Sequence, residues 1–231
     1  AVEVVGNQVH LDLAYEAACR SLTLLKHNYA GSLSAESTLL VGGALAADAE
    51  ALNSGWKVEG GPGLSIQEAL AQRINGDRII AIGNDSSLIP GSSHGVDAAI
   101  FAIGEPASTH QPPWGVANLG IPEDELALLR AVKEHGIPII SIIILSRPYV
   151  LAELVDLSDS VLVVYRPGVS QGALAIVDAL FGDVPINGKL PIQLPRSLEQ
   201  ITCQREDLAL DMDDPLFEFG DGIELSSFRN E

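Results

Sequence analysis

Apolar residues alternate along the chain between short β-branched runs and longer segments with helical spacing. Continuous apolar runs are typical of buried strands, and apolar positions three or four residues apart are typical of helices. The runs predict strands at Thr38–Gly43, Arg78–Ile82, Ala98–Gly104, Ile137–Leu145 and Ser160–Tyr165. The helical spacing predicts helices at Leu11–Lys26, Ala44–Leu52, Ile66–Ile74, Pro122–His135, Val150–Leu157 and Gln171–Phe181.

Local signals mark several ends of these elements. Ser65, with Glu68 three residues later, forms a capping-box pattern, while Pro122 precedes an acidic first turn and Gly136 ends the same helix. The run Ile137–Leu145 is the most β-branched and is expected at the centre of a sheet. Alternating strands and helices, with glycine or proline at each switch, predict the α/β class: a three-layer αβα sandwich around a mostly parallel open sheet of about five to six strands.

Composition supports one domain over residues 1–231. The chain is 47% apolar but only 5% aromatic, a balance found where helices cover both faces of a parallel sheet. Its formal charge of −18 repels phosphate backbones and anionic lipid surfaces, so we predict no nucleic acid and no membrane partner. The longest apolar run is interrupted by Pro138 and Ser141 and is too short to cross a bilayer. We expect a soluble chain, either cytoplasmic or secreted.

Motifs for nucleotides and metals are missing. The first glycine turn, Gly42–Ala47, does not fit GxGxxG, and Gly182–Lys189 has the wrong spacing for a phosphate loop. The five histidines show no paired metal spacing. Cys19 and Cys203 lie far apart, outside any CxxC pattern. The sequence therefore predicts no cofactor and no metal.

The predicted sheet indicates where a ligand would bind. In open parallel sheets the ligand crevice lies beyond the carboxyl ends of the strands. The loops expected at that edge are Gly42-Gly43, Gly83–Asp85, Gly104-Glu105, Ser146–Pro148 and Arg166–Gly168.

Several short segments stand in fixed order over nearly the whole chain. They are Ala14–Lys26, Gly42–Gly61 with Asp48 and Trp56, Ile103–Glu105, Ser146–Pro148, Tyr165–Gly168, Ala179–Val184, Gly188–Pro191 and Asp214–Gly220. Each segment alone is a weak signal, but the ordered set resembles the C-terminal domain of family 3 glycoside hydrolases.

The resemblance implies a β-glucosidase-like function. Members are typically two-domain retaining enzymes that remove sugars from the nonreducing ends of β-linked glycosides. Their nucleophilic aspartate lies on an N-terminal (β/α)₈ barrel, a domain of roughly 250 residues by itself. The implied partners are therefore a β-linked glucoside or oligosaccharide and that barrel domain. We expect this chain to form one wall of the sugar pocket and to show little or no glycosidase activity alone.

Two further expectations follow from this interpretation. The alternative function is a non-catalytic carbohydrate-binding or scaffold module. In either case the face intended for the barrel would be exposed in the isolated chain, which favours a homo-oligomer.

Three residues are candidates for substrate binding. Trp56, in a glycine-rich polar loop, offers an indole platform for a sugar face, with plain packing as the alternative. Asp48 has two open interpretations, recognition of sugar hydroxyls and helix capping. Arg147 could bind a ligand or form a structural ion pair at a strand end.

Two residues are candidates for catalysis. Retaining hydrolysis needs two carboxyl groups about 5 Å apart, and this chain could offer only the proton donor. The resemblance places that donor a few residues beyond Gly104-Glu105, where His110 stands instead of a glutamate. Histidine transfers protons near neutral pH, although a solvated loop histidine is the alternative. Glu105 is the remaining carboxylate, and its alternative role is to hold the loop in shape.

Overall fold

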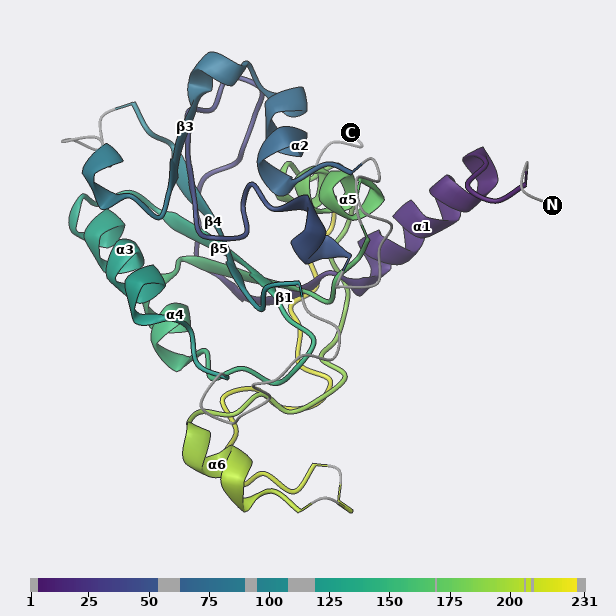
Figure 1. The fold of residues 1–231 in the computed structure, drawn as a ribbon, viewed down its shortest axis with the longest axis vertical. Coiled ribbons are helices and arrows are strands. Elements are labelled where there is room, and N and C mark those ends of the chain that lie inside the picture. Colours follow the sequence, from purple (N-terminus) through teal and green to yellow (C-terminus); the bar gives the residue numbers. More distant parts are fainter. Residues whose placement is uncertain are drawn as a thin grey trace.

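The computed structural model describes residues 4–53, 63–89, 95–107, 119–168, 170–205, 207–208 and 210–227. Its centre is a six-stranded sheet in the order β1-β6-β5-β4-β2-β3, in which only β1 runs antiparallel to its neighbour (Figure 1). The strands are β1 Thr23–His27, β2 Leu39–Gly42, β3 Ile79–Gly83, β4 Ala98–Gly104, β5 Ile139–Ile144 and β6 Ser160–Val164. The mostly parallel sheet and its strand number confirm the predicted α/β class.

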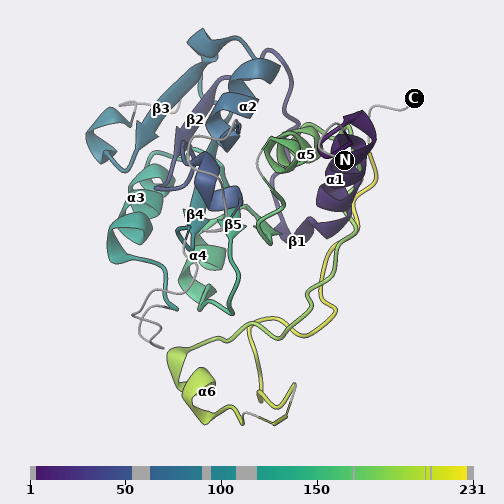
Figure 2. The same cartoon turned by 45° about the vertical axis from the view of Figure 1, so that its right-hand side comes forward.

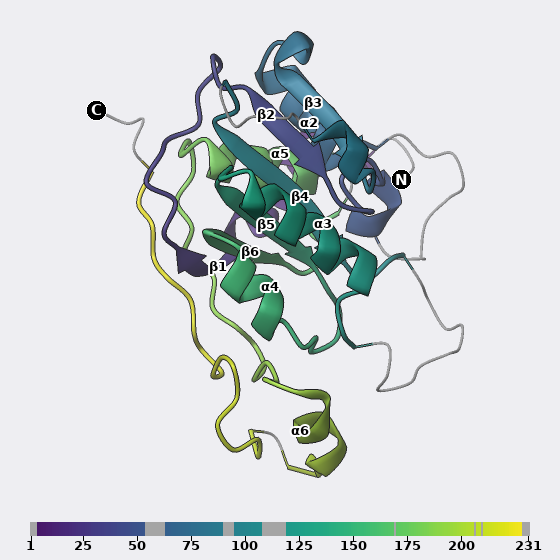
Figure 3. The ribbon, with the colours of Figure 1, turned by 90° about the vertical axis from the view of Figure 1, so that its left-hand side faces the viewer.

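Helices cover both faces of this sheet. Figure 3 shows α3 and α4 in front of the strands, with α2 and α5 behind them, and α1 packs along α5. The α-helices are α1 Gln8–Ser21, α2 Ile66–Arg73, α3 Glu123–Glu134, α4 Ala152–Leu157, α5 Gln171–Leu180 and α6 Leu198–Cys203. The described residues also form short 3₁₀ turns, η1 Ala49–Leu52, η2 Gly76–Arg78 and η3 Ser86–Leu88. The layers form the predicted αβα sandwich.

The core divides into two clusters because side chains alternate across a strand. In β5, Ile140, Ile142 and Ile144 join the cluster beneath α2 and α5, while Ile139 and Ile143 join the cluster beneath α3 and α4. All five side chains are at most 4% exposed. Full burial of one such side chain contributes about 1.5–3 kcal/mol, so this strand anchors both layers.

The predicted helix ends are confirmed at α2 and α3. The Glu68 amide donates to Ser65 Oγ (3.2 Å) and the Ser65 amide donates to Glu68 Oε2 (2.8 Å), which completes the capping box. Pro122 precedes α3, and Gly136 follows it with φ of +71°, the left-handed conformation that ends many helices.

Two predicted helices differ from the structure. The segment Leu11–Lys26 is helical only as far as Ser21, and Thr23–His27 is strand β1, paired with β6. The apolar positions there fit both a helical and a strand period, and the pairing with β6 makes the segment a strand. In the segment Ala44–Leu52, residues 44–47 form a turn and only Ala49–Leu52 is helical, as the 3₁₀ turn η1. Its first backbone groups bond elsewhere: the Leu45 amide donates to Ala102 O (3.1 Å).

The region after β6 and α5 forms an arm that the sequence analysis did not predict. The described residues between 191 and 220 leave the body, include α6 and return to it (Figure 2). Bonds from the Leu194 amide to Phe217 O and from the Gly220 amide to Leu190 O, both 2.9 Å, close its base. Within the described ranges, no helix combines the length and the apolarity that crossing a bilayer requires.

Candidate functional site

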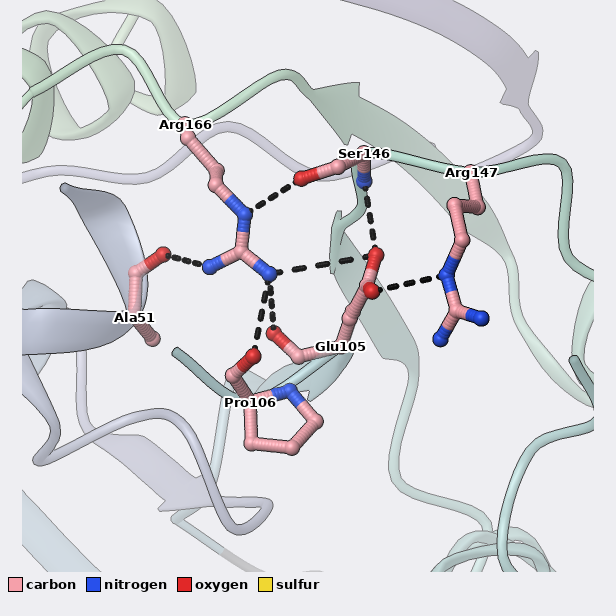
Figure 4. A network of polar contacts seen from close by, with 6 residues as sticks. All are labelled: Ala51, Glu105, Pro106, Ser146, Arg147 and Arg166. Carbon is pink, nitrogen blue, oxygen red and sulfur yellow. Dashed lines mark hydrogen bonds and ion pairs between the residues drawn. The ribbon is translucent and has the colours of Figure 1, made fainter. Parts of the chain in front are cut away.

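The carboxyl ends of β2, β4, β5 and β6 meet at one edge of the sheet, as parallel pairing requires. Figure 4 shows the polar network at this edge, formed by side chains from the ends of β4, β5 and β6 and by the backbone of η1. The structure therefore brings together three of the loops named from the sequence, those after β4, β5 and β6, with the η1 turn.

Glu105 lies at the centre of this network, directly after β4, and is only 3% exposed. Its Oε1 accepts a hydrogen bond from Arg147 Nε (2.8 Å), and its Oε2 accepts one from the Ser146 amide (3.1 Å). The Glu105 amide in turn donates to Ile144 O (2.8 Å). The carboxylate thus ties the end of β4 to the end of β5.

Arg147 forms the ion pair that was one of its two predicted roles. Its side chain is 28% exposed, and the guanidinium carbon lies 5.9 Å from the ring centroid of the buried Tyr149. A cation within about 6 Å of an aromatic face is attracted to it. Glu105 and Tyr149 therefore orient a guanidinium that still reaches the surface, so ligand binding stays a prediction.

Arg166 is the residue of this site that the sequence analysis missed. Only its loop was named there, although an arginine directly after a buried strand is a usable signal. Its Nη1 donates to Ala51 O (2.8 Å), its Nη2 donates to Glu105 O (3.1 Å) and Pro106 O (3.0 Å), and its Nε donates to Ser146 Oγ. Burial lowers the pKa of the guanidinium, while the Glu105 charge, 3.8 Å from Nη2, opposes this shift.

Asp48 caps the η1 turn, which is one of its two predicted roles. Its carboxylate accepts a hydrogen bond from the Glu50 amide (2.8 Å), and the side chain is half-buried. Arg166 binds the same turn through Ala51 O. Asp48 is therefore connected to the network through η1, and its role in recognising hydroxyl groups stays a prediction.

Trp56 and His110 lie outside the described residues. Their predicted roles, as sugar platform and as proton donor, stay predictions from the sequence.

A second buried carboxylate, Glu125, lies beside this edge. It occupies the first turn of α3, is 3% exposed, and its Oε1 accepts a hydrogen bond from the Ala44 amide (3.0 Å), directly after the β2 loop. Burial raises the pKa of its carboxyl group, against the opposing effect of the Ala44 amide. The sequence signal was an acidic residue in the apolar stripe of α3 with Leu129 and Val132.

We expect Glu125→Gln to make the folded state more stable at neutral pH. Folding raises the pKa of Glu125. The stability that Glu125 contributes is therefore fully present at pH values below its unfolded-state pKa, and it is lost as pH rises through its folded-state pKa. The loss is about 1.4 kcal/mol for each unit of the shift. Urea unfolding of both proteins between pH 4 and 8 should show the variant's advantage growing with pH.

Glu68→Gln is the matched control for that experiment. Hydrogen bonds from the Ser65 amide and hydroxyl lower the pKa of Glu68, so its contribution has the opposite pH dependence. If the stability gained in Glu125→Gln were constant across the pH range, the raised pKa of Glu125 would be contradicted.

Comparison with known proteins connects this arrangement to one family. Residues 22–225 match the family described as Glycosyl hydrolase family 3 C-terminal domain. This range includes every residue of the Glu105 network.

Individual relatives agree with this match. Beta-glucosidase C of Emericella nidulans is 28% identical over 97% of this chain and 31% of its own length. A beta-glucosidase from Listeria innocua, solved in complex with isofagomine, superposes with a TM-score of 0.80 at 22% identity, covering 97% of this chain and 35% of that one. A mutant of the exo-1,3/1,4-beta-glucanase ExoP from a Pseudoalteromonas species gives a TM-score of 0.76 at 26% identity, covering 95% and 37%. The chain thus spans about a third of the length of these proteins.

Proposed function

Because this chain belongs to the Glycosyl hydrolase family 3 C-terminal domain family, we propose that it forms one wall of the sugar pocket of a β-glucosidase-like enzyme. The substrate would be a β-linked glucoside or oligosaccharide, cleaved at its nonreducing end. The nucleophile would come from an N-terminal (β/α)₈ barrel domain, which is the proposed partner.

The observation that carries this proposal is the placement of Arg147. It lies at the carboxyl edge of the sheet, where open α/β sheets bind their ligands. Its guanidinium is partly exposed, while Glu105 and Tyr149 fix its position from the buried side. A held arginine with an exposed side is suited to donate hydrogen bonds to sugar hydroxyl groups.

The contacts of Glu105 favour different roles for the two candidate catalytic residues, Glu105 and His110. Both of its carboxylate oxygens accept hydrogen bonds from loop residues, and the side chain is 3% exposed. These contacts favour the alternative in which Glu105 holds the loop and orients Arg147. His110 then remains the proposed proton donor.

The same contacts lend support to the alternative function, a non-catalytic carbohydrate-binding or scaffold module. With Glu105 buried, the proposed sugar contacts are those of Arg147, Asp48 and Trp56. The described apolar residues also include an exposed stripe at the start of α1, formed by Val9 and Leu13 on the helix and Val5 just before it. This stripe is consistent with association with the barrel or with a second copy of the chain.

A sugar titration tests the binding role. We expect glucose and short β-glucans to produce saturable amide shifts at Asp48, Ser146 and Arg147 in NMR spectra of this chain. Arg147→Ala should weaken binding at least tenfold, or about 1.4 kcal/mol, because it removes the partly exposed guanidinium. Trp56→Ala should abolish the shifts if the indole is the platform.

Arg130→Ala serves as the control, because Arg130 forms exposed ion pairs with Glu123 and Glu153 on the α3 and α4 surface. It should bind sugar as the wild type does. Absence of saturable shifts in the wild type, or equal affinity in Arg147→Ala, would reject the proposed sugar wall.

A further inference from the structure

We propose that Arg166 is a positioning residue that holds three loops of the sheet edge in a single arrangement. These loops are η1, the segment after β4 and the segment after β5. The inference rests on the proposed function for its purpose, since η1 is capped by Asp48 and the segment after β5 carries Arg147, two of the proposed sugar-binding residues.

The contacts of Arg166 reach all three loops at once. Nη1 binds Ala51 O of η1, Nη2 binds the carbonyls of Glu105 and Pro106 after β4, and Nε binds Ser146 Oγ after β5 (Figure 4). All three nitrogen atoms of the guanidinium therefore donate, in four hydrogen bonds. Because each loop is held by the same rigid plane, a movement of one loop disturbs the contacts of the others.

Burial makes these bonds difficult to replace. The Arg166 side chain is 8% exposed, so few water molecules can take over the three carbonyls or the hydroxyl group. Its low exposure also separates it from Arg147, at 28%, because Arg166 has little surface with which to touch a ligand. Arg166 would therefore act through the residues that it holds.

The backbone around Arg166 carries strain that the contacts must offset. Arg166 and Ser170 both have left-handed φ values, +49° and +55°, although neither is glycine. Each such residue costs about 1–3 kcal/mol and persists where the surrounding structure fixes it. The Gly168 amide adds a second tie to η1, donating to Leu52 O (2.9 Å). The loop is thus bound to η1 by both a side chain and a backbone group.

Arg166→Lys is the informative variant, because it keeps the charge and loses the planar fork. A lysine ammonium is a compact group that cannot bind all three loops in the same geometry. Arg73→Lys is the matched control: Arg73 pairs with Asp178 and Asp183 and lies over Phe181, between α2 and α5. Both variants make the same chemical change at a partly buried, multiply paired arginine.

Hydrogen exchange gives a readout that does not depend on sugar. The Asn53 amide, bonded to Glu50 O (2.9 Å), reports on η1, and the Ser146 amide, bonded to Glu105 Oε2 (3.1 Å), reports on the other two loops. In Arg166→Lys both amides should exchange at least tenfold faster, while β5 amides keep their rates. Arg73→Lys should leave both reporters unchanged. Sugar affinity should fall at least tenfold in Arg166→Lys only.

Other outcomes overturn the inference. Faster exchange at Gly168 alone, or uniformly through β5, would show that Arg166 is only a local or a general stabiliser. Loosened loops with unchanged sugar affinity would show that their arrangement does not matter for binding. If the wild type binds no sugar, the proposed function fails, and the exchange rates alone still decide whether Arg166 joins the loops.

Discussion

Gly104→Ala should lower the free energy of unfolding by about 3–5 kcal/mol, one of the two largest effects that we expect from a single substitution. Gly104 ends β4 with φ of +136°, and a Cβ there would lie 2.1 Å from Ile144 O. Backbone strain at such a φ costs roughly 1–3 kcal/mol, and a forced steric contact in a packed region costs a similar amount. The contact is with backbone, so no side-chain rotation can relieve it.

The clash would also reach the functional edge. Ile144 O accepts the Glu105 amide (2.8 Å), so a displaced carbonyl moves the carboxylate that orients Arg147. We therefore expect Gly104→Ala to weaken sugar binding in whatever fraction of the protein remains folded. Thermal unfolding should show a midpoint lower by roughly 10 °C.

Gly136→Ala separates the cost of backbone strain from the cost of the steric contact with Ile144 O. Gly136 also has a left-handed φ, +71°, but a Cβ there would meet nothing within 4 Å. Strain alone should then cost about 1 kcal/mol. If Gly104→Ala and Gly136→Ala lowered the free energy of unfolding equally, the close approach of residue 104 to Ile144 O would contribute nothing, contrary to our assignment.

Most of the fold could be predicted because its strands carry their own signal. Ala98–Gly104 is a continuous apolar run in the sequence and is β4 with the same bounds in the structure. Strand β1 could not be predicted in this way. Leu22 and Leu25 fit a helical period, and only pairing with β6, distant in sequence, makes Thr23–His27 a strand. Local patterns report local preferences, which tertiary contacts override.

The site was predictable in its location but only partly in its members. The rule that ligands bind beyond the carboxyl ends of parallel strands named the loops of Glu105, Arg147 and Arg166. It could not show that Arg166 reaches η1 through Ala51 O, because that contact joins residues 115 positions apart. Nor could it separate the partly exposed Arg147 from the buried Arg166 side chain, since each lies within three residues of a strand end. Burial and hydrogen-bond geometry decide these roles, and neither is readable from spacing.

Glu105→Ala should lower the free energy of unfolding by about 3 kcal/mol, the other large effect. Removing one partner of a buried ion pair leaves the remaining charge without compensation, which typically costs about 3–5 kcal/mol. The lower end applies here because Arg147 is 28% exposed and can recover water, whereas Arg166, at 8%, keeps its carbonyl partners. Urea unfolding of the wild type and the variant at pH 7 measures the difference.

Two further variants test whether burial of the ion pair causes the stability loss expected for Glu105→Ala. Glu153→Ala breaks the exposed ion pair with Arg130 and should cost at most about 1 kcal/mol. In the Glu105→Ala background, Arg147→Ala should cost less than it does in the wild type, because its partner is already gone. Additive losses would show that the two side chains stabilise the edge independently. Tyr149, rather than Glu105, would then hold Arg147 in position. The contacts that stabilise the buried Glu105 carboxylate would be those with Ser146 and Arg166.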